Sequence, residues 1–257
     1  MIVSHPDQMW FFDATFKHFP DLFSGKVLDI GSMDLNGGPH LLLNPQSYTG
    51  VDVAQGPNVN LVKSGHLVDF NNEHFDASIS SECFEHNIYW AETFRNMVRM
   101  TKNCGIVAIS AAGIGRQEHG TNRTDGRFAS QSNTQDYYKN ISKRDLHKVS
   151  METDLASFFI IKNWYSKDVY FVAIKNCSDS NTLINFTKLQ KEIRSFAIKK
   201  NLFFIVSIIK SPIRNLISLT NTTILNKLVF IKHSLQQLNR DQNHISKCFP
   251  CRIEFLK

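Results

Sequence analysis

The residues with the clearest chemical potential are two aspartates, each placed in a short apolar run of the chain. Asp29 lies in the run 27–30, which Gly31 follows, and Asp52 ends the run 48–52. Asp52 comes 52 − 31 = 21 residues after Gly31. In open α/β folds a glycine turn after the first strand approaches the ligand, and a carboxylate at this distance accepts the ribose hydroxyls. The spacing therefore predicts a nucleoside-containing cofactor.

The composition of the glycine turn discriminates between cofactors. A dinucleotide fingerprint needs G-x-G-x-x-G, so that a pyrophosphate can lie at a helix N-terminus. Here Met33 stands where the second glycine should be, and Asp34 adds an acidic neighbour. Asp29 and Asp34 would repel a pyrophosphate and attract a cation. The pattern favours S-adenosylmethionine, with its sulfonium and ammonium groups, over NAD.

Further motifs resemble those of the class I S-adenosylmethionine-dependent methyltransferases. Residues 75–86, FDASISSECFEH, are similar to the family's fourth strand and its E-x-x-E-H turn. Residues 97–110 are similar to the helix-turn-strand often written R-x-L-K-P-G-G, with Asn103-Cys104 replacing Pro-Gly. The resemblance spans about residues 25–175 and is closest to the type 11-like subgroup found with sugar and surface-polysaccharide biosynthesis genes. In that subgroup the first loop reads D-x-G-S-x-D-x-N-G.

The resemblance implies a role for each segment of the cofactor site. Asp29 and the turn would face the methionine part, and Asp52 would bind the ribose. Ser64-Gly65-His66 replaces the acidic residue that often holds the adenine amino group. The expected cofactor contacts are Asp29, Gly31, Ser32, Asn36, Gly37, Asp52, Val53, Gly65, His66, Ser81 and Glu82.

Candidates for acceptor chemistry follow the fourth and fifth predicted strands. A hydroxyl acceptor loses its proton near the moment of methyl transfer, normally to His, Asp or Glu. His119, in the long polar loop 111–140, is the preferred base or substrate contact, and its alternative is a solvated loop histidine. His86 is the second candidate, or a brace of the sheet edge. An anionic acceptor would be held by loop residues Arg116, Arg123 and Arg127, unless they are ordinary surface charge, and Asp125 is a further expected substrate contact. No metal site is predicted.

The alternation of apolar runs and helical patterns predicts a Rossmann-like α/β fold with a mostly parallel sheet. We expect seven strands, the last forming an antiparallel hairpin. Parallel strands are predicted near 26–30, 48–52, 60–63, 75–80 and 105–110, and the hairpin at 158–164 and 169–174, joined by 165–168. Helices are expected near 38–44, 90–101 and 142–150. The predicted domains are a helical cap (1–24), which either packs on the sheet or closes the cleft, a cofactor-binding domain (25–180) and an extension (181–257).

The extension differs from the rest of the chain in charge. Residues 1–180 carry 16 basic and 20 acidic residues, a balance of −4, and residues 181–257 carry 13 and 3, a balance of +10. Helical periodicity predicts amphipathic helices at 183–197 and 224–238, with Pro212 ending or kinking any helix that crosses it. Packing or homo-oligomer contact, peripheral membrane attachment and, least favoured, nucleic-acid binding are the alternatives.

Composition and cysteine usage indicate a cellular setting. A hydrophobic content of 42% and a charged content of 20% are typical of globular proteins. The five cysteines lack the spacing of a disulfide framework, and Cys248-x-x-Cys251 has no second pair or histidine cluster to complete a zinc site. No signal peptide is evident. We expect free thiols and a location in the cytoplasm or at the inner face of its membrane.

These observations lead to one main functional hypothesis and two alternatives. The main hypothesis is an O-methyltransferase that acts on a sugar or polysaccharide precursor by in-line methyl transfer with histidine-assisted deprotonation. One alternative is a binding or scaffold subunit that keeps the fold without the reaction. The other is a small-molecule methyltransferase with a non-glycan acceptor.

Overall fold

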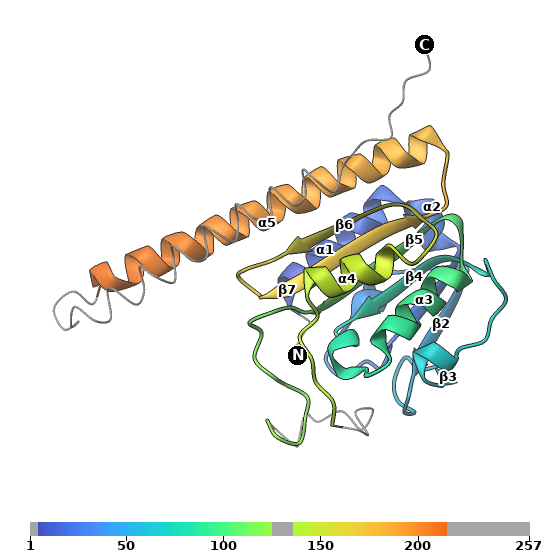
Figure 1. Ribbon diagram of the computed structural model, residues 1–257, viewed down its shortest axis with the longest axis horizontal. Coiled ribbons are helices and arrows are strands. Elements are labelled where there is room, and N and C mark those ends of the chain that lie inside the picture. The colour runs from blue at the N-terminus through green and yellow to red at the C-terminus, as the bar shows by residue number, and fades with distance from the viewer. Residues whose placement is uncertain (1–4, 125–135, 215–257) are drawn as a thin grey trace, which may run out of the picture. The chain divides into compact units, whose positions relative to one another are not determined.

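A seven-stranded sheet forms the centre of the computed structural model, which describes residues 5–124 and 136–214. The strand order is β3-β2-β1-β4-β5-β7-β6 (Figure 1). Strands β1 to β5 pair in parallel, and β7 runs antiparallel to both β5 and β6. The strands are Lys26–Ile30 (β1), Ser47–Asp52 (β2), Leu61–Val62 (β3), Phe75–Ser81 (β4), Thr101–Ala112 (β5), Leu155–Lys162 (β6) and Asp168–Lys175 (β7). The predicted α/β class and mostly parallel sheet are confirmed.

Helices cover both faces of the sheet, and each face has its own apolar core. On one face, α1 (Pro6–His18), α2 (Pro20–Ser24) and the first half of α5 (Ser180–Arg214) pack against side chains such as Val27 and Ile106. On the other, α3 (Trp90–Met100) and α4 (Lys143–Ser150), which lie together in Figure 1, pack against Leu28 and Val107. Continuous apolar strands are what a sheet covered on both sides requires.

The aromatic N-terminal segment is a packing helix of this core. Phe11 stacks on Tyr170 of β7 with ring centroids 4.6 Å apart, and Trp10 stacks on Phe196 of α5 at 3.7 Å. Such pairs bury large apolar areas. The first of the two interpretations of this segment, packing on the sheet, is therefore confirmed.

Helix α5 begins the predicted basic extension and shares the sheet's core. Its buried residues follow the predicted helical spacing: Phe186, Leu189, Ile193 and Ala197. One compact unit spans Met1–Lys200 and a second spans Asn201–Lys257, so the first turns of the extension belong with the sheet. The helix ends at Arg214, two residues after Pro212. The second predicted helix, 224–238, and Cys248-x-x-Cys251 lie outside the described residues. Within residues 5–124 and 136–214, no helix has the length and hydropathy needed to cross a membrane.

Local predictions were wrong at two places. The expected helix at 38–44 is only a 3₁₀ turn, Pro39–Leu42, because Pro45 disfavours helical geometry at the residue before it. The hairpin turn was placed at 165–168, but Asp168 is already the first residue of β7. By contrast, the helix expected at 142–150 is confirmed, and Ser142 and Asp145 form a reciprocal capping box at its start.

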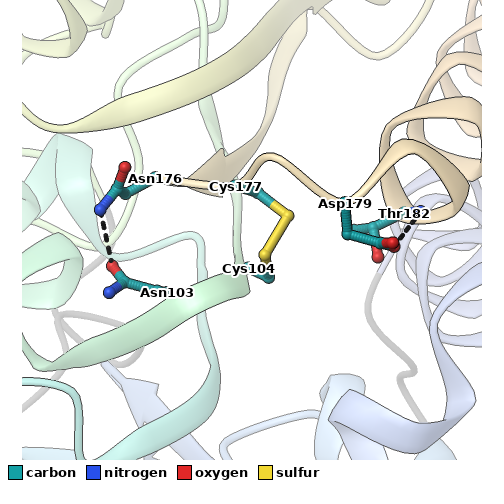
Figure 2. The surroundings of a disulfide bond; sticks show 6 residues. All are labelled: Asn103, Cys104, Asn176, Cys177, Asp179 and Thr182. Carbon is teal, nitrogen blue, oxygen red and sulfur yellow. Dashed lines mark hydrogen bonds between the residues drawn. A yellow bond between two sulfur atoms is a disulfide. The ribbon is translucent and has the colours of Figure 1, made fainter.

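A disulfide joins Cys104 and Cys177, so the expectation of free thiols was wrong for this pair (Figure 2). The two residues are 73 positions apart, and their Cα atoms are 4.5 Å apart because β5 and β7 are antiparallel neighbours. Asn176 Nδ2 donates to Asn103 Oδ1 beside the disulfide, at 3.3 Å. Cys83 is the free cysteine among the described residues. The cross-link fixes the sheet at the point where the chain leaves it for α5.

We expect loss of this disulfide to lower the free energy of unfolding by about 2–4 kcal/mol, because a cross-link over so long a loop restricts the unfolded chain. Chemical denaturation of the Cys104→Ser/Cys177→Ser variant, with and without reductant, measures the effect. Reductant should lower the midpoint of the unaltered protein and of a Cys83→Ser control but leave the double variant unchanged. An equal response of all three proteins would show that the bond contributes nothing.

Candidate functional site

The parallel strands bring the chemistry-bearing residues to one edge of the sheet. Ile30, the last residue of β1, pairs with Val51 of β2 and with Ser80 of β4. Ser81, the last residue of β4, pairs with Ser110 of β5. The segments that follow these strands therefore meet at the carboxyl edge, where open α/β folds bind ligands.

Asp29 is a buried carboxylate with one oxygen left for a ligand. The Tyr48 hydroxyl donates to Oδ2 at 2.6 Å, whereas Oδ1 is buried and has no hydrogen-bond partner among the described residues. Burial raises the pKa of Asp29 to about 7, the Tyr48 hydrogen bond opposes this rise, and the charge of Asp52 adds to it. A buried acceptor without a donor is unusual in folded proteins and indicates a missing partner.

The glycine turn after β1 is held in one conformation. Gly31 has φ +78°, and a side chain there would overlap that of Cys83, so only glycine fits. The backbone N–H groups of Gly31 and Ser32 both donate to Val51 O, at 2.8 and 3.1 Å. Asn58 Nδ2 donates to Ser32 O and to the Tyr48 hydroxyl, at 2.9 and 2.7 Å. This network ties the turn to the segment after β2 and orients the Tyr48 donor toward Asp29.

Asp34 has a structural role that the sequence did not indicate. Its Oδ1 accepts from Gly37 N at 2.6 Å, and its Oδ2 lies 3.1 Å from His40 Nε2. The Asp34 carboxylate is thus engaged within its own loop. Asn36, an expected cofactor contact, is exposed in the same loop. The prediction that negative charge at this site attracts a cationic cofactor therefore depends on Asp29 and Asp52.

Asp52 lies at the end of β2, as the spacing predicted. Oδ1 accepts from Val53 N at 2.7 Å, and Oδ2 accepts from Met33 N at 3.2 Å. Burial raises its pKa, and these backbone donors act in the opposite direction. Ala54 N–H is a further backbone donor to this carboxylate, and a carboxylate has about four acceptor positions, so acceptor capacity remains for a ligand. Val53 itself is 43% exposed.

The segment after β3 provides a surface beside Asp52's strand. Gly65 is buried, and a side chain there would press on Thr93 and Ile30. The His66 and Tyr89 rings have centroids 4.1 Å apart, and Tyr89 is 43% exposed. Exposed aromatic rings at a ligand edge suit the face of a purine. Tyr89 was missed by the sequence analysis because no spacing rule distinguishes it from a surface tyrosine.

Helix α1 completes the edge after β4. Gln8 Nε2 donates to Glu82 Oε1 at 2.7 Å and to Ser110 Oγ at 2.9 Å. Glu82 has φ 49°, a left-handed conformation that its side-chain contacts must hold. Ser81 Oγ lies 3.4 Å from Ser110 Oγ. The packing helix thus also lines the candidate site.

Arg116 and Arg123, which were predicted to hold an anionic acceptor, both pair with carboxylates of the chain itself. Arg116 Nη1 donates to the buried Asp168 at 2.6 Å, and its Nη2 lies 3.8 Å from Glu82 Oε2. Arg123 pairs with Glu118 at 2.7 Å and with Asp136 at 2.8 Å. Asp125 and Arg127 lie outside the described residues. These pairs give no support to an anionic acceptor at Arg116 or Arg123, whose roles stay predictions.

The two candidate histidines lie together. Their ring centroids are 5.2 Å apart, and each ring is 5.3 Å from that of Tyr138. Burial lowers the pKa of His86 to about 4 and, more weakly, that of His119. Glu85 is fully buried beside them, and burial together with Glu82 raises its pKa. Sequence spacing placed these residues after strands four and five, but their convergence depends on the loop 113–124.

Comparisons with known proteins extend the description of the fold. No protein-family model and no curated protein sequence matches the chain. Solved structures do: a methyltransferase from Thermotoga maritima is 13% identical over 65% of this chain and 93% of its own, with a TM-score of 0.43. The 1,6-didemethyltoxoflavin-N1-methyltransferase of Burkholderia thailandensis, with S-adenosylhomocysteine bound, is 13% identical over 66% and 79% of the two chains, with a TM-score of 0.46. The [4+2]-cyclase SpnF is 12% identical over 66% and 81%, at 0.47.

These similarities concern the arrangement of the sheet and its helices. The function of the present chain has to be inferred from its own site.

We expect Asp29→Asn to stabilise the protein at pH 8 and not at pH 4. Below its ordinary pKa of 3.8, Asp29 is protonated in both folded and unfolded chains, so it costs nothing. As the pH rises toward 7, the unfolded chain loses this proton before the folded chain does. The free energy of unfolding therefore falls by up to about 4 kcal/mol. The amide is neutral throughout, so at pH 8 the melting temperature should rise by about 5–10 °C.

Thermal unfolding at the two pH values tests this prediction. Tyr48→Phe is the matched control, since it removes the donor to Asp29 and should lower the melting temperature at pH 8. If Asp29→Asn melts at a lower temperature than the unaltered protein at pH 8, the buried Asp29 carboxylate does not destabilise the fold, and the prediction is wrong.

Proposed function

We propose that this protein is an S-adenosylmethionine-dependent methyltransferase. The observation that carries the proposal is the buried Oδ1 of Asp29, which has no partner in the described parts of the chain and lies at the same sheet edge as the oriented carboxylate of Asp52. S-adenosylmethionine supplies an ammonium group, a ribose diol and an electrophilic methyl group in one molecule. At this edge Asp29 offers an acceptor for the ammonium group, and Asp52 offers acceptors for the ribose diol.

Each part of the site has a definite task in holding this cofactor. Asp29 Oδ1 accepts a hydrogen bond from the ammonium group, which supplies the missing donor. Asp52 accepts the two ribose hydroxyls. The rigid turn at Gly31 lets the ligand approach the backbone, and the Tyr89 and His66 rings border the adenine. A pyrophosphate would instead lie beside two buried carboxylates, which disfavours NAD.

The acceptor side of the site favours a neutral, hydroxyl-rich substrate. Glu82, Glu85 and Asp168 are balanced there by the single guanidinium of Arg116. Such a surface offers many hydrogen-bond acceptors and repels anions. We therefore propose that the acceptor is a sugar or a similar polyol, as in the sequence-based hypothesis, but without a phosphate or carboxylate at Arg116. His119, with its 38% exposed side chain, is the group that meets the reacting hydroxyl.

Methyl transfer at this site depends mainly on positioning. The cofactor's methyl group is already activated, and transfer requires the acceptor oxygen to lie in line behind it. Gln8 and Ser110 fix Glu82, and Arg116 fixes Asp168, so the groups around the acceptor are held before it binds. Preorganised groups of this kind lower the cost of reaching the reactive geometry.

We expect Asp52→Ala to weaken S-adenosylmethionine binding at least tenfold, because it removes both ribose contacts. Isothermal calorimetry measures the affinity, and Asp69→Ala, at an exposed aspartate of the same region, is the control that should stay within about twofold. NAD should show no saturable binding. Equal affinities for Asp52→Ala and the control would refute the assigned cofactor site.

We expect S-adenosylhomocysteine to form when the protein is incubated with S-adenosylmethionine and a suitable polyol from a panel of neutral and phosphorylated sugars. Turnover should favour the neutral compounds, and His119→Ala should lower it at least tenfold while leaving cofactor affinity within about twofold. Mass spectrometry of the product identifies the methylated oxygen. Strong cofactor binding with no turnover across the panel would favour the non-catalytic alternative or a different acceptor class.

A further inference from the structure

A cluster at the acceptor side of the edge has the composition of a metal site. Glu85, His86 and His119 each offer one ligand atom, and these atoms lie within 4.8 Å of one another. Two imidazoles and a carboxylate bind Zn²⁺ and other divalent transition metals. We propose that these three residues bind a divalent transition-metal ion, a site that the sequence analysis did not predict.

Unsatisfied buried atoms provide a second observation, independent of the ligand set. Glu85 is 0% exposed, and its Oε1 accepts from Ala112 N at 3.1 Å, while its Oε2 has no donor among the described residues. The neighbouring Glu82 carboxyl lies close enough to share a hydrogen bond with Glu85 when one of the two is protonated. His86 Nδ1 is likewise buried and without a partner in the described parts of the chain. Buried polar atoms almost always have a hydrogen-bond partner, so two such atoms without one in a single cluster indicate that a ligand binds there.

The orientation of His119 is that of a metal ligand. Its Nδ1 lies 3.0 Å from Gln117 O, and a carbonyl can only accept, so Nδ1 carries the proton. The lone pair is therefore on Nε2, which lies 3.9 Å from both Glu85 Oε1 and Glu82 Oε2. A backbone carbonyl that fixes the tautomer in this way is the usual partner of metal-binding histidines.

The local charge also favours a cation. Glu82, Glu85 and Asp168 carry three acidic groups, and Arg116 is the base that pairs with two of them. A divalent ion would stabilise the charged forms of these carboxyl groups.

The geometry defines how the cluster would close around an ion. Ligand atoms of a tetrahedral zinc ion lie about 3.3 Å apart, so the present spacing must shrink by roughly 1.5 Å. His119 lies in the loop after β5 and is 38% exposed, so its side chain has room to rotate toward Glu85. Three protein ligands leave a fourth position open. If the proposed function holds, that position takes the acceptor oxygen, and His119 acts on the hydroxyl through the ion rather than directly; the binding of the ion itself does not depend on it.

Zinc titration of the full chain tests the proposal. The background is the Cys248→Ser/Cys251→Ser variant, since C-x-x-C spacing can bind zinc by itself. Calorimetry and metal analysis after dialysis should show one Zn²⁺ per chain. Glu85→Gln, which keeps an oxygen for Ala112 N–H, and His119→Ala should each weaken binding at least tenfold. His74→Ala, at a histidine outside the cluster, should leave it unchanged.

Two results would overturn the metal site: no stoichiometric zinc binding by the background protein, or equal losses in His74→Ala and His119→Ala. S-adenosylmethionine affinity, measured on the metal-free proteins, separates this proposal from the previous one. Zinc binding without cofactor binding keeps the metal site and refutes the proposed function. Cofactor binding without zinc binding refutes the metal site and leaves the proposed function in place.

Discussion

The structure depends on one constraint, the parallel pairing of β1 with β2 and β4, and of β4 with β5. Parallel strands end at the same edge, so residues that lie far apart in the chain meet there. Asp29, Asp52, Glu82 and the loop after β5 owe their proximity to this register. A shift of one residue in β1 would move Asp29 to the opposite face of the sheet, because side chains alternate along a strand.

The burial of Asp29 links stability to ligand binding. The carboxylate is held by one tyrosine hydroxyl and has a second oxygen with no donor, an arrangement that favours its neutral form. A cationic ligand that donates to this oxygen favours the charged form and removes part of the cost of burial. Such local costs are common where a site is preorganised for its ligand. The Asn58 and Tyr48 hydrogen bonds keep this geometry in place before any ligand arrives.

The acceptor side resembles the surroundings of Asp29 in holding carboxyl groups away from solvent, and it contains more of them. Glu85 and Asp168 are buried, Glu82 is 24% exposed, and the Arg116 guanidinium reaches Glu82 and Asp168. The packing helix α1 contributes Gln8, which satisfies Glu82, so the helix that completes the core also orders the site. Among the described residues, Glu85 Oε2 and His86 Nδ1 are buried without a hydrogen-bond partner, and both residues belong to the cluster with His119. Both proposed occupants of the edge, the cofactor and the metal ion, are cations, which fits its excess of carboxylates.

The sequence alone determined the fold class, the strands of the parallel sheet and the position of Asp29 and Asp52 at strand ends, because apolar runs and glycine turns are local signals. It did not reveal Tyr48 and Asn58 as partners of the turn, or Gln8 as a partner of Glu82, since these contacts join segments whose distance in space depends on sheet order. The Cys104–Cys177 disulfide was missed for the same reason: 73 residues separate the two thiols, and only the pairing of β5 with β7 brings them together. Tertiary structure likewise decided that Arg116 and Arg123 are paired internally and that Glu85, His86 and His119 converge. Burial and pairing are properties of the folded chain, and no spacing along the sequence encodes them.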